Sequence, residues 1–208
     1  MSQKIVICGA GFLGQSGQCH SSRTLDDAGG RFDGCRPGSN IAKALVGPNS
    51  SSNVLRRVQV SSRRPERVHA ALRQVVDEKR LLPPQAVDVV KADTVVSAVH
   101  DADVVVSLVG IMHGTPEEFD EIQWKGAANV ARAAKDVGAK LIHFSAIGAD
   151  VNSNIPYART KGLGEQAVMD ICPDATIVRP SIVFGPGDDF FNVRDFHIVS
   201  CSSSHRAR

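Results

Sequence analysis

A glycine-rich turn directly after a short apolar run constrains this chain more than any other feature. The apolar residues 5–8 are followed at once by Gly9, Gly11 and Gly14 in the pattern Gly-x-Gly-x-x-Gly. A short apolar run that ends in glycine predicts a strand buried on both faces of a sheet. Gly9 would allow a sharp turn, Gly11 would let the backbone approach a pyrophosphate, and Gly14 would let the next helix pack closely. The pattern therefore predicts a dinucleotide-binding turn.

The helix that should follow this turn is displaced along the sequence. Residues 15–38 show no apolar period, and the next helical pattern is 39–47, with Ser39 as the N-cap and Gly47 as the stop. Without the intervening segment, Gly14 would lead straight into this helix. A long structureless loop is uncommon inside a compact domain. We interpret 15–38 as an insertion from an unspliced segment or a faulty gene model, and a tolerated surface loop is the alternative.

The rest of the chain alternates between apolar runs and amphipathic stretches. Strands are predicted over residues 54–61, 87–92, 103–109, 140–145 and 175–178. Helices are predicted over residues 67–80, 94–100, 115–137 and 157–172. The third of these opens with Thr115, Pro116 and Glu118, which is a capping-box pattern. The alternation predicts a doubly wound Rossmann domain over 1–192, with an irregular tail over 193–208.

Composition and charge exclude several classes of function. The 208 residues are 42% hydrophobic, enough for one α/β domain with a sizeable core. A net charge of +2, with acids and bases interspersed, argues against a nucleic-acid partner. No apolar run reaches the roughly eighteen residues that a membrane-spanning helix needs. Seven histidines lack the spacing of metal ligands, and five cysteines show no close pairing, which favours a reducing, intracellular compartment.

The second predicted strand ends in a basic turn where the nicotinamide cofactor would be selected. An acid usually lies about twenty residues past the glycine turn and binds the ribose 2′-OH. Once 15–38 is subtracted, this position holds Ser61, Ser62, Arg63 and Arg64, without an acid. Guanidinium groups make bidentate, charge-assisted contacts with phosphate. The turn therefore favours NADP(H) over NAD(H), and a solvated basic turn is the alternative.

Two further positions at predicted strand ends suit the same ligand. Asp93, after the third strand, could accept a hydrogen bond from the adenine amine, or cap the helix 94–100, or do both. Val109 and Gly110 lie at the end of the fourth strand and would bring backbone against the ribose on the nicotinamide side.

Ser145, Tyr157 and Lys161 form the sharpest candidate catalytic group. Tyr157 and Lys161 are four residues apart and would share one face of a helix. A nearby ammonium would lower the pKa of the tyrosine, which could then exchange a proton with a carbonyl or alcohol. Ser145, at the end of the fifth strand, could hydrogen-bond the same oxygen. Tyr157 is also the only tyrosine in the chain.

Taken together, these motifs resemble those of extended or atypical short-chain dehydrogenases/reductases. The resemblance rests on Gly9-x-Gly11-x-x-Gly14, Ser145, Tyr157-x-x-x-Lys161 and the run Arg179-Pro-Ser-Ile-Val-Phe-Gly-Pro-Gly187. Within that superfamily, residues 143–150, 157–161 and 188–192 resemble the accessory subunit nine of the alpha subcomplex of respiratory complex I, with its bacterial and fungal relatives. A related fungal branch acts in ubiquinone biosynthesis. The resemblance covers 1–14 and 39–192.

The resemblance implies a bound dinucleotide that is structural rather than turned over. It implies contacts to NADPH from Gly9, Gly11, Phe12, Leu13, Gly14, Ser62, Arg63, Arg64, Asp93, Val109, Gly110, Lys161, Pro180, Ile182 and Val183, the last three near the nicotinamide. It also places Gln123 where extended reductases often carry a helix asparagine, which weakens the usual proton relay. Because relatives continue well past Asn192, the C-terminal substrate lobe is expected to be truncated here.

Three functions remain open at this stage. The first is a mitochondrial NADPH-binding protein that assembles with complex I or with ubiquinone-synthesis proteins and turns over little. The second is an active NADP-dependent reductase or epimerase that uses Tyr157 and Lys161. The third is a binding module whose partner senses NADPH. Mitochondrial location follows from the resemblance alone; because no presequence or signal peptide is visible, the cytoplasm is the alternative.

Overall fold

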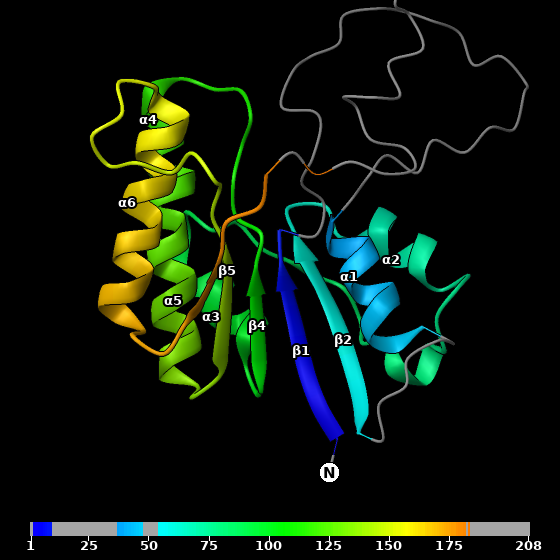
Figure 1. Cartoon of the computed structure of the whole chain (residues 1–208). Helices are drawn as coiled ribbons and strands as arrows, with labels where there is room; N and C mark the ends of the chain where they lie inside the picture. The colour runs from blue at the N-terminus through cyan, green and yellow to red at the C-terminus, as the bar shows by residue number, and fades with distance from the viewer. Residues whose placement is uncertain (1, 10–36, 48–53, 182, 184–208) are drawn as a thin grey trace, which may run out of the picture.

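The computed structural model describes residues 2–9, 37–47, 54–181 and 183. In this part of the chain, six parallel strands form one sheet in the order β3-β2-β1-β4-β5-β6 (Figure 1). The strands are β1 Ser2–Cys8, β2 Leu55–Ser62, β3 Gln85–Ala86, β4 Val104–Ser107, β5 Lys140–Phe144 and β6 Thr176–Val178. The predicted doubly wound, Rossmann-like parallel sheet is confirmed.

Helices pack on both faces of this sheet (Figure 1). The helices are α1 Pro37–Val46, α2 Glu66–Leu72, α3 Ala92–Val99, α4 Pro116–Phe119, α5 Gly126–Asp136 and α6 Pro156–Ile171. Buried residues of α1 and α2 share one apolar core, and those of α3, α5 and α6 share another. The two groups lie on opposite faces because crossovers between parallel strands are right-handed, and the chain reverses direction across the sheet after β3.

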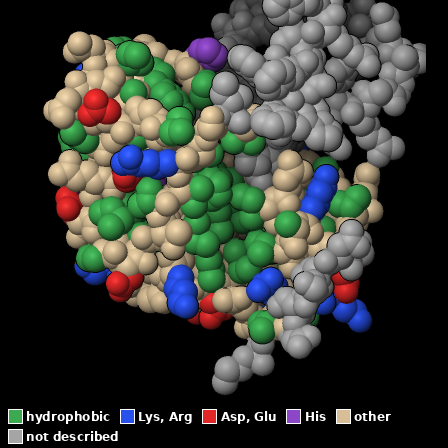
Figure 2. Space-filling view, viewed as in Figure 1, with side chains coloured by type: hydrophobic (Ala, Val, Ile, Leu, Met, Phe, Trp, Pro, Cys, Tyr) green, Lys and Arg blue, Asp and Glu red, His purple; other side chains and the backbone are tan. Residues whose placement is uncertain are grey.

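Strand β1 lies between these two cores and explains why its residues are so apolar. Val6 and Cys8 pack with α3 and α5, whereas Ile5 and Ile7 pack with α1 and α2. All four are buried, as the unbroken apolar run predicts for a strand covered on both faces. On the α1 side, Figure 2 shows hydrophobic side chains gathered over the middle of the molecule, between the two groups of helices. Half-buried Phe144 of β5 packs against the core on this face.

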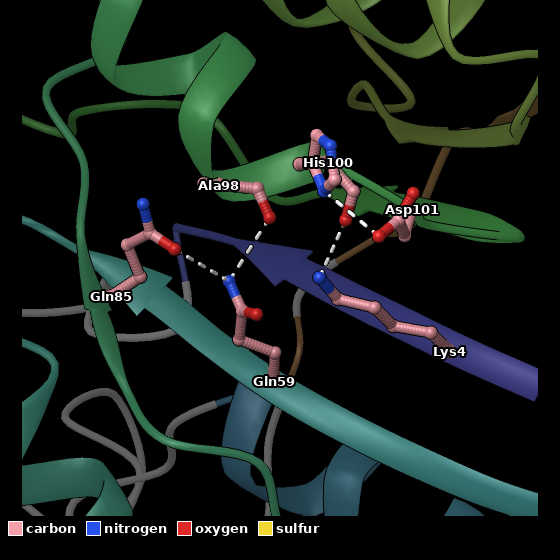
Figure 3. Close-up of polar contacts among 6 residues, drawn as sticks. All are labelled: Lys4, Gln59, Gln85, Ala98, His100 and Asp101. Atoms are coloured by element: carbon pink, nitrogen blue, oxygen red, sulfur yellow. Dashed lines mark hydrogen bonds and ion pairs between the residues drawn. The ribbon is translucent and has the colours of Figure 1, made fainter.

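Polar contacts fasten α3 to the central strands (Figure 3). The amide nitrogen of Gln59, a buried residue of β2, donates to the carbonyl oxygen of Ala98 at 3.0 Å. The Lys4 ammonium of β1 donates to the carbonyl oxygen of His100 at 2.6 Å. Because both contacts reach the C-terminal end of α3, they hold this helix against β1 and β2.

The helix that follows β4 begins as predicted but changes its winding. The Thr115 hydroxyl accepts from the Glu118 amide, and the Glu118 carboxylate accepts from the Thr115 amide, so the predicted capping box is confirmed. A π-helical segment, Asp120–Lys125, then separates α4 from α5. The predicted single helix over 115–137 is therefore three segments, and π-helical turns of this kind are frequent at functional sites.

The predicted helix over 67–80 is wrong in its second half. Helix α2 ends at Leu72, and a separate 3₁₀ turn covers Glu78–Arg80. That turn is started by the Asp77 carboxylate, which accepts a hydrogen bond from the Lys79 amide at 2.9 Å. A local side-chain bond of this kind competes with continuation of the helix.

The third predicted strand is also shorter and earlier than expected. Strand β3 pairs only with the end of β2, through Ser61 and Ser62, and it lies at the edge of the sheet. The Thr94 hydroxyl then donates to the Asp88 carbonyl oxygen and accepts from the Asp88 amide. These bonds turn the chain into α3, so Ala92 belongs to a helix rather than to the strand predicted over 87–92.

The predicted insertion and tail largely lie outside the described residues, as do Gly11, Gly14 and the intervening residues 12 and 13. Helix α1 begins at Pro37, two residues before the predicted N-cap Ser39. No helix of the described residues is both long and apolar enough to cross a membrane.

Candidate dinucleotide and carbonyl site

The sheet has its switch point between β1 and β4, where ligands of doubly wound sheets bind. Gly9 ends β1 with a φ of +85°, and its amide donates to the Ser61 carbonyl oxygen at 2.8 Å. A Cβ added to Gly9 would lie 2.9 Å from the Leu108 carbonyl oxygen. Only glycine fits both constraints, and the close approach leaves backbone at the edge where a phosphate would lie. Gly9 therefore fits the first glycine of a dinucleotide-binding turn.

Loops after β4, β5 and β6 meet at the same edge. Ser145 donates its amide to the Val178 carbonyl oxygen at 2.8 Å, and Ile147 donates to the Pro180 carbonyl oxygen at 3.0 Å. Gly110 follows β4 and lies against the side chain of Lys161. The structure thus brings together predicted residues from three strand ends and one helix.

Lys161 joins the ends of two strands through its ammonium group. Its Nζ donates to the Val109 carbonyl oxygen at 2.9 Å and to the Phe144 carbonyl oxygen at 3.1 Å. Burial lowers the pKa of Lys161 to about 8. A Cβ at Gly110 would lie 3.0 Å from this Nζ, so the lysine fills the space beside the β4 end. The buried ammonium group therefore hydrogen-bonds to backbone carbonyl oxygens in this structure.

The pKa of Tyr157 shifts in the opposite direction to the one predicted from the sequence. Burial raises the pKa of Tyr157, whereas the sequence predicted that Lys161 would lower it. The expectation fails because the ammonium bonds to the two strand ends rather than to the phenol. The Tyr157 ring meets Phe119 edge-to-face, with 6.3 Å between ring centroids. A raised pKa favours the protonated phenol over the phenolate.

Ser145 supplies a buried hydroxyl group at the end of β5. Its Oγ is buried and has no hydrogen-bond partner among the described residues. The same holds for both polar atoms of the Gln123 side chain, which comes from the π-helical segment. A Cβ at Gly110 would lie 3.5 Å from Gln123 Oε1, so this amide lies near the Lys161 side chain. Buried polar groups without partners cost stability, and a bound ligand or water would relieve that cost.

Three titratable residues behind the site were not among the site residues predicted from the sequence. His143 Nδ1 lies 3.1 Å from the Ser107 hydroxyl, and burial lowers the pKa of His143 to about 3, with a further contribution from Lys161. Arg179 donates to both carboxylate oxygens of Glu165, at 2.9 and 2.6 Å. These bonds hold the pKa of Glu165 below its usual range. The Ser145 hydroxyl adds a smaller effect in the same direction, although it makes no hydrogen bond of good geometry. Glu165 could have been found from its spacing, since it follows Lys161 by four residues.

The remaining predicted cofactor residues divide into three groups. Ser62 ends β2 and is followed by exposed Arg63 and Arg64, so the basic turn lies at the ligand edge of the sheet. Asp93 is exposed in the first turn of α3, whose N-cap is Lys91, so the capping interpretation of Asp93 is wrong. Pro180 and Val183 follow β6, whereas Ile182 lies outside the described residues. No cluster of metal-ligating side chains occurs in the described parts of the chain.

The fold and this site define a Rossmann domain of the reductase type, and comparisons with known proteins give the family. The chain belongs to the NAD dependent epimerase/dehydratase family, whose profile matches residues 37–201. Solved structures share the fold. A dTDP-4-dehydrorhamnose reductase from Clostridium acetobutylicum matches with a TM-score of 0.55 and 21% identity, over 90% of this chain and 56% of that one. A Bacillus anthracis enzyme of the same name, in complex with NADP, matches with a TM-score of 0.53 and 18% identity, over 89% and 55%.

Curated relatives include subunits of complex I and bacterial reductases. The mitochondrial NADH dehydrogenase (ubiquinone) 1 alpha subcomplex subunit 9 of Dictyostelium discoideum is 31% identical over 120 residues, 57% of this chain and 33% of that protein. The 40 kDa subunit of Neurospora crassa NADH-ubiquinone oxidoreductase is 37% identical over 47% of this chain and 27% of its own length. Ceramide reductase of Caulobacter vibrioides is 39% identical over 42% and 28%. The matches thus span a third or less of these relatives.

Proposed function

We propose that the chain is the nucleotide-binding part of a complex I accessory-type protein, which holds NADP(H) and turns it over little or not at all. Its partners would be respiratory complex I or ubiquinone-synthesis proteins, and its location the mitochondrion. The names of the Dictyostelium and Neurospora relatives support this proposal. The basic turn at Arg63 and Arg64 supports the preference for NADP(H).

One observation carries the choice of little or no turnover. The Lys161 ammonium donates to the carbonyl oxygens of Val109 and Phe144, so it stabilises the strand ends instead of activating Tyr157. The phenol is held in its protonated form by burial. A lysine that stabilises the strand ends at the cofactor site is consistent with a dinucleotide that has a structural role.

An active reductase is the second candidate, and the Ser145 hydroxyl, which makes no hydrogen bond of good geometry to the described residues, favours it. A bound dinucleotide would supply hydride. The Tyr157 phenol would donate a proton to a carbonyl oxygen, and the Ser145 hydroxyl would donate a hydrogen bond to the same oxygen. The name of the Caulobacter relative is consistent with this activity. Hydrogen bonds at catalytic sites often tighten only when ligands are bound, which keeps this candidate open.

Tyr157→Phe separates the two functions. We expect the tagged chain to co-purify with complex I from its own mitochondria, and Tyr157→Phe to leave both this association and NADPH binding unchanged, because the substitution removes only the phenol oxygen. Native gel electrophoresis and NADPH oxidation assays measure the two properties.

The reductase candidate makes the opposite prediction. There the chain would oxidise NADPH in the presence of a carbonyl compound, and Tyr157→Phe would lower that rate by about 10²- to 10⁴-fold, the usual contribution of acid-base catalysis. Such a loss, without any association with complex I, would refute the accessory function.

A further inference from the structure

Exposed apolar side chains lie on the loop after β4 and on the loop that joins Ser145 to Tyr157. Large hydrophobic residues are normally buried, and a cluster of exposed ones beside a site indicates a binding surface. On the loops after β4 and β5, four such residues are exposed at 49%, 70%, 38% and 64%: Met112, Ile147, Val151 and Ile155, respectively. We call these four residues the apolar rim.

The apolar rim is tied to the residues that would face a ligand. Ile147 follows Ser145 by two residues, and Ile155 precedes Tyr157 by two. The Ile147 amide donates to the Pro180 carbonyl oxygen at 3.0 Å, which joins the rim to the loop after β6. The backbone of Ile147 is therefore held at the edge where the strands end.

The loop after β5 is also fixed to helix α6. The Asp150 amide donates to the Ala158 carbonyl oxygen at 3.1 Å. A Cβ added to Gly162 would lie 2.7 Å from the Val151 amide nitrogen, so the loop backbone packs directly on this helix. Because α6 carries Tyr157, the rim and the phenol keep a fixed relation to one another.

Charge distinguishes between the ligands that such a rim could accept. Residues 108–115 and 145–155 contain no Lys or Arg, and Asp150 is their only carboxylate. Beyond β6, Arg179 is already neutralised by its bidentate contact with Glu165. A diphosphate or carboxylate ligand would need guanidinium or ammonium partners, which these loops do not offer. An uncharged apolar chain would instead gain free energy by covering the rim.

We propose that the apolar rim binds an uncharged, long-chain carbonyl compound, whose oxygen lies at Ser145 and Tyr157, and that it disfavours sugar nucleotides. The Ser145 hydroxyl has no partner among the described residues, and the Tyr157 phenol is protonated, so both can donate to a carbonyl oxygen. The proposal rests on the proposed dinucleotide site and names the ligand class beside it. It requires binding only and holds with or without turnover.

Calorimetric titration of the full chain, saturated with NADP, tests the proposal with two probes, 2-undecanone and UDP-glucose. The double variant Ile147→Asp, Ile155→Asp places two carboxylates in the rim. Val96 and Met169 provide a matched control, since they are exposed at 50% and 39% on α3 and α6 outside the rim. The control is Val96→Asp with Met169→Asp, which adds the same charge elsewhere.

The expected result is saturable binding of 2-undecanone that the rim variant weakens at least tenfold and the control changes by less than about twofold. UDP-glucose should bind more weakly than 2-undecanone to the unmodified chain. The proposal is overturned if UDP-glucose binds more tightly, if the ketone fails to bind, or if both double variants behave alike. It is also overturned if the rim variant abolishes self-association or pelleting with phosphatidylcholine vesicles while the ketone does not bind.

Titration with NADPH alone keeps this test separate from the proposed function. If NADPH binds and 2-undecanone does not, only the ligand class is wrong. If NADPH itself fails to bind to a folded chain, the proposed dinucleotide function is wrong as well.

Discussion

Between pH 6.5 and pH 3, His143 should lower the free energy of unfolding of the chain by about 4 kcal/mol, since one pKa unit corresponds to about 1.4 kcal/mol. His143→Gln should abolish this loss. Burial lowers the pKa of His143 from its usual value of 6.5 to about 3. Between these values the unfolded chain binds a proton that the native chain does not. Native stability must therefore fall as the pH falls through this window. Glutamine does not titrate, so its variant should lack this part of the acid dependence.

Urea unfolding from pH 7 to pH 3 measures this effect as a difference between the two proteins. Ser107→Ala is the matched control, because it removes the hydroxyl bonded to His143 Nδ1 but leaves the buried ring. The control should lose stability at pH 7 and keep the acid dependence. If the free energies of unfolding of the chain and of His143→Gln fell in parallel with pH, His143 would become protonated in the native state without opening the core. The prediction would then be wrong.

Gly164→Ala should lower the free energy of unfolding by about 2 kcal/mol. This is the opposite of the usual effect, since alanine normally stabilises a helix relative to glycine. A Cβ at Gly164 would lie 2.4 Å from the carbonyl oxygen of Gln123, which belongs to backbone and cannot rotate away. Helix α6 and the π-helical segment would have to separate. The close approach of these two segments is what places Gln123 beside the Lys161 side chain.

Gly148→Ala is the control for this substitution, because a Cβ there meets no atom within 4 Å and the backbone needs no positive φ. We expect its free energy of unfolding in urea to stay within about 0.5 kcal/mol of that of the unmodified chain. If Gly164→Ala were equally neutral, the contact between α6 and the π-helical segment would not exist as described. An unchanged dependence on urea concentration would show that the two variants unfold from comparable states.

The sequence predicted those features that depend on a single segment. The buried strand that ends at Gly9 and the capping box at Thr115 each follow from neighbouring residues, and both are confirmed. Ser145 and Lys161 also reach the same edge of the sheet, because the carboxyl ends of parallel strands lie together. The fold class was predictable for the same reason, since alternation of strand and helix is a local property.

The errors arise where distant segments decide the outcome. The direction of the Tyr157 pKa shift depends on Lys161 reaching two strand ends, a contact made across 52 residues in one case. The length of β3 depends on pairing with two residues at the end of β2. The π-helical conformation of the backbone at Gln123 depends on packing against α6. Periodicity along one segment contains none of these contacts.

The central claim is that the ligand edge of this sheet holds NADP(H), with Arg63 and Arg64 at the 2′-phosphate. Its most direct test is calorimetric titration of the chain with NADPH and with NADH. The double variant Arg63→Ser, Arg64→Ser removes two cations at the end of β2. Arg132→Ser with Lys135→Ser is the matched control, because it removes two exposed cations from α5.

We predict that NADPH binds at least tenfold more tightly than NADH, since charge-assisted hydrogen bonds contribute about 1.5–3 kcal/mol. The substitutions at Arg63 and Arg64 should reduce NADPH affinity to that of NADH, and the α5 control should retain the difference. Equal affinity for the two dinucleotides would contradict the assignment of the 2′-phosphate, and failure of the folded chain to bind either would contradict the account as a whole.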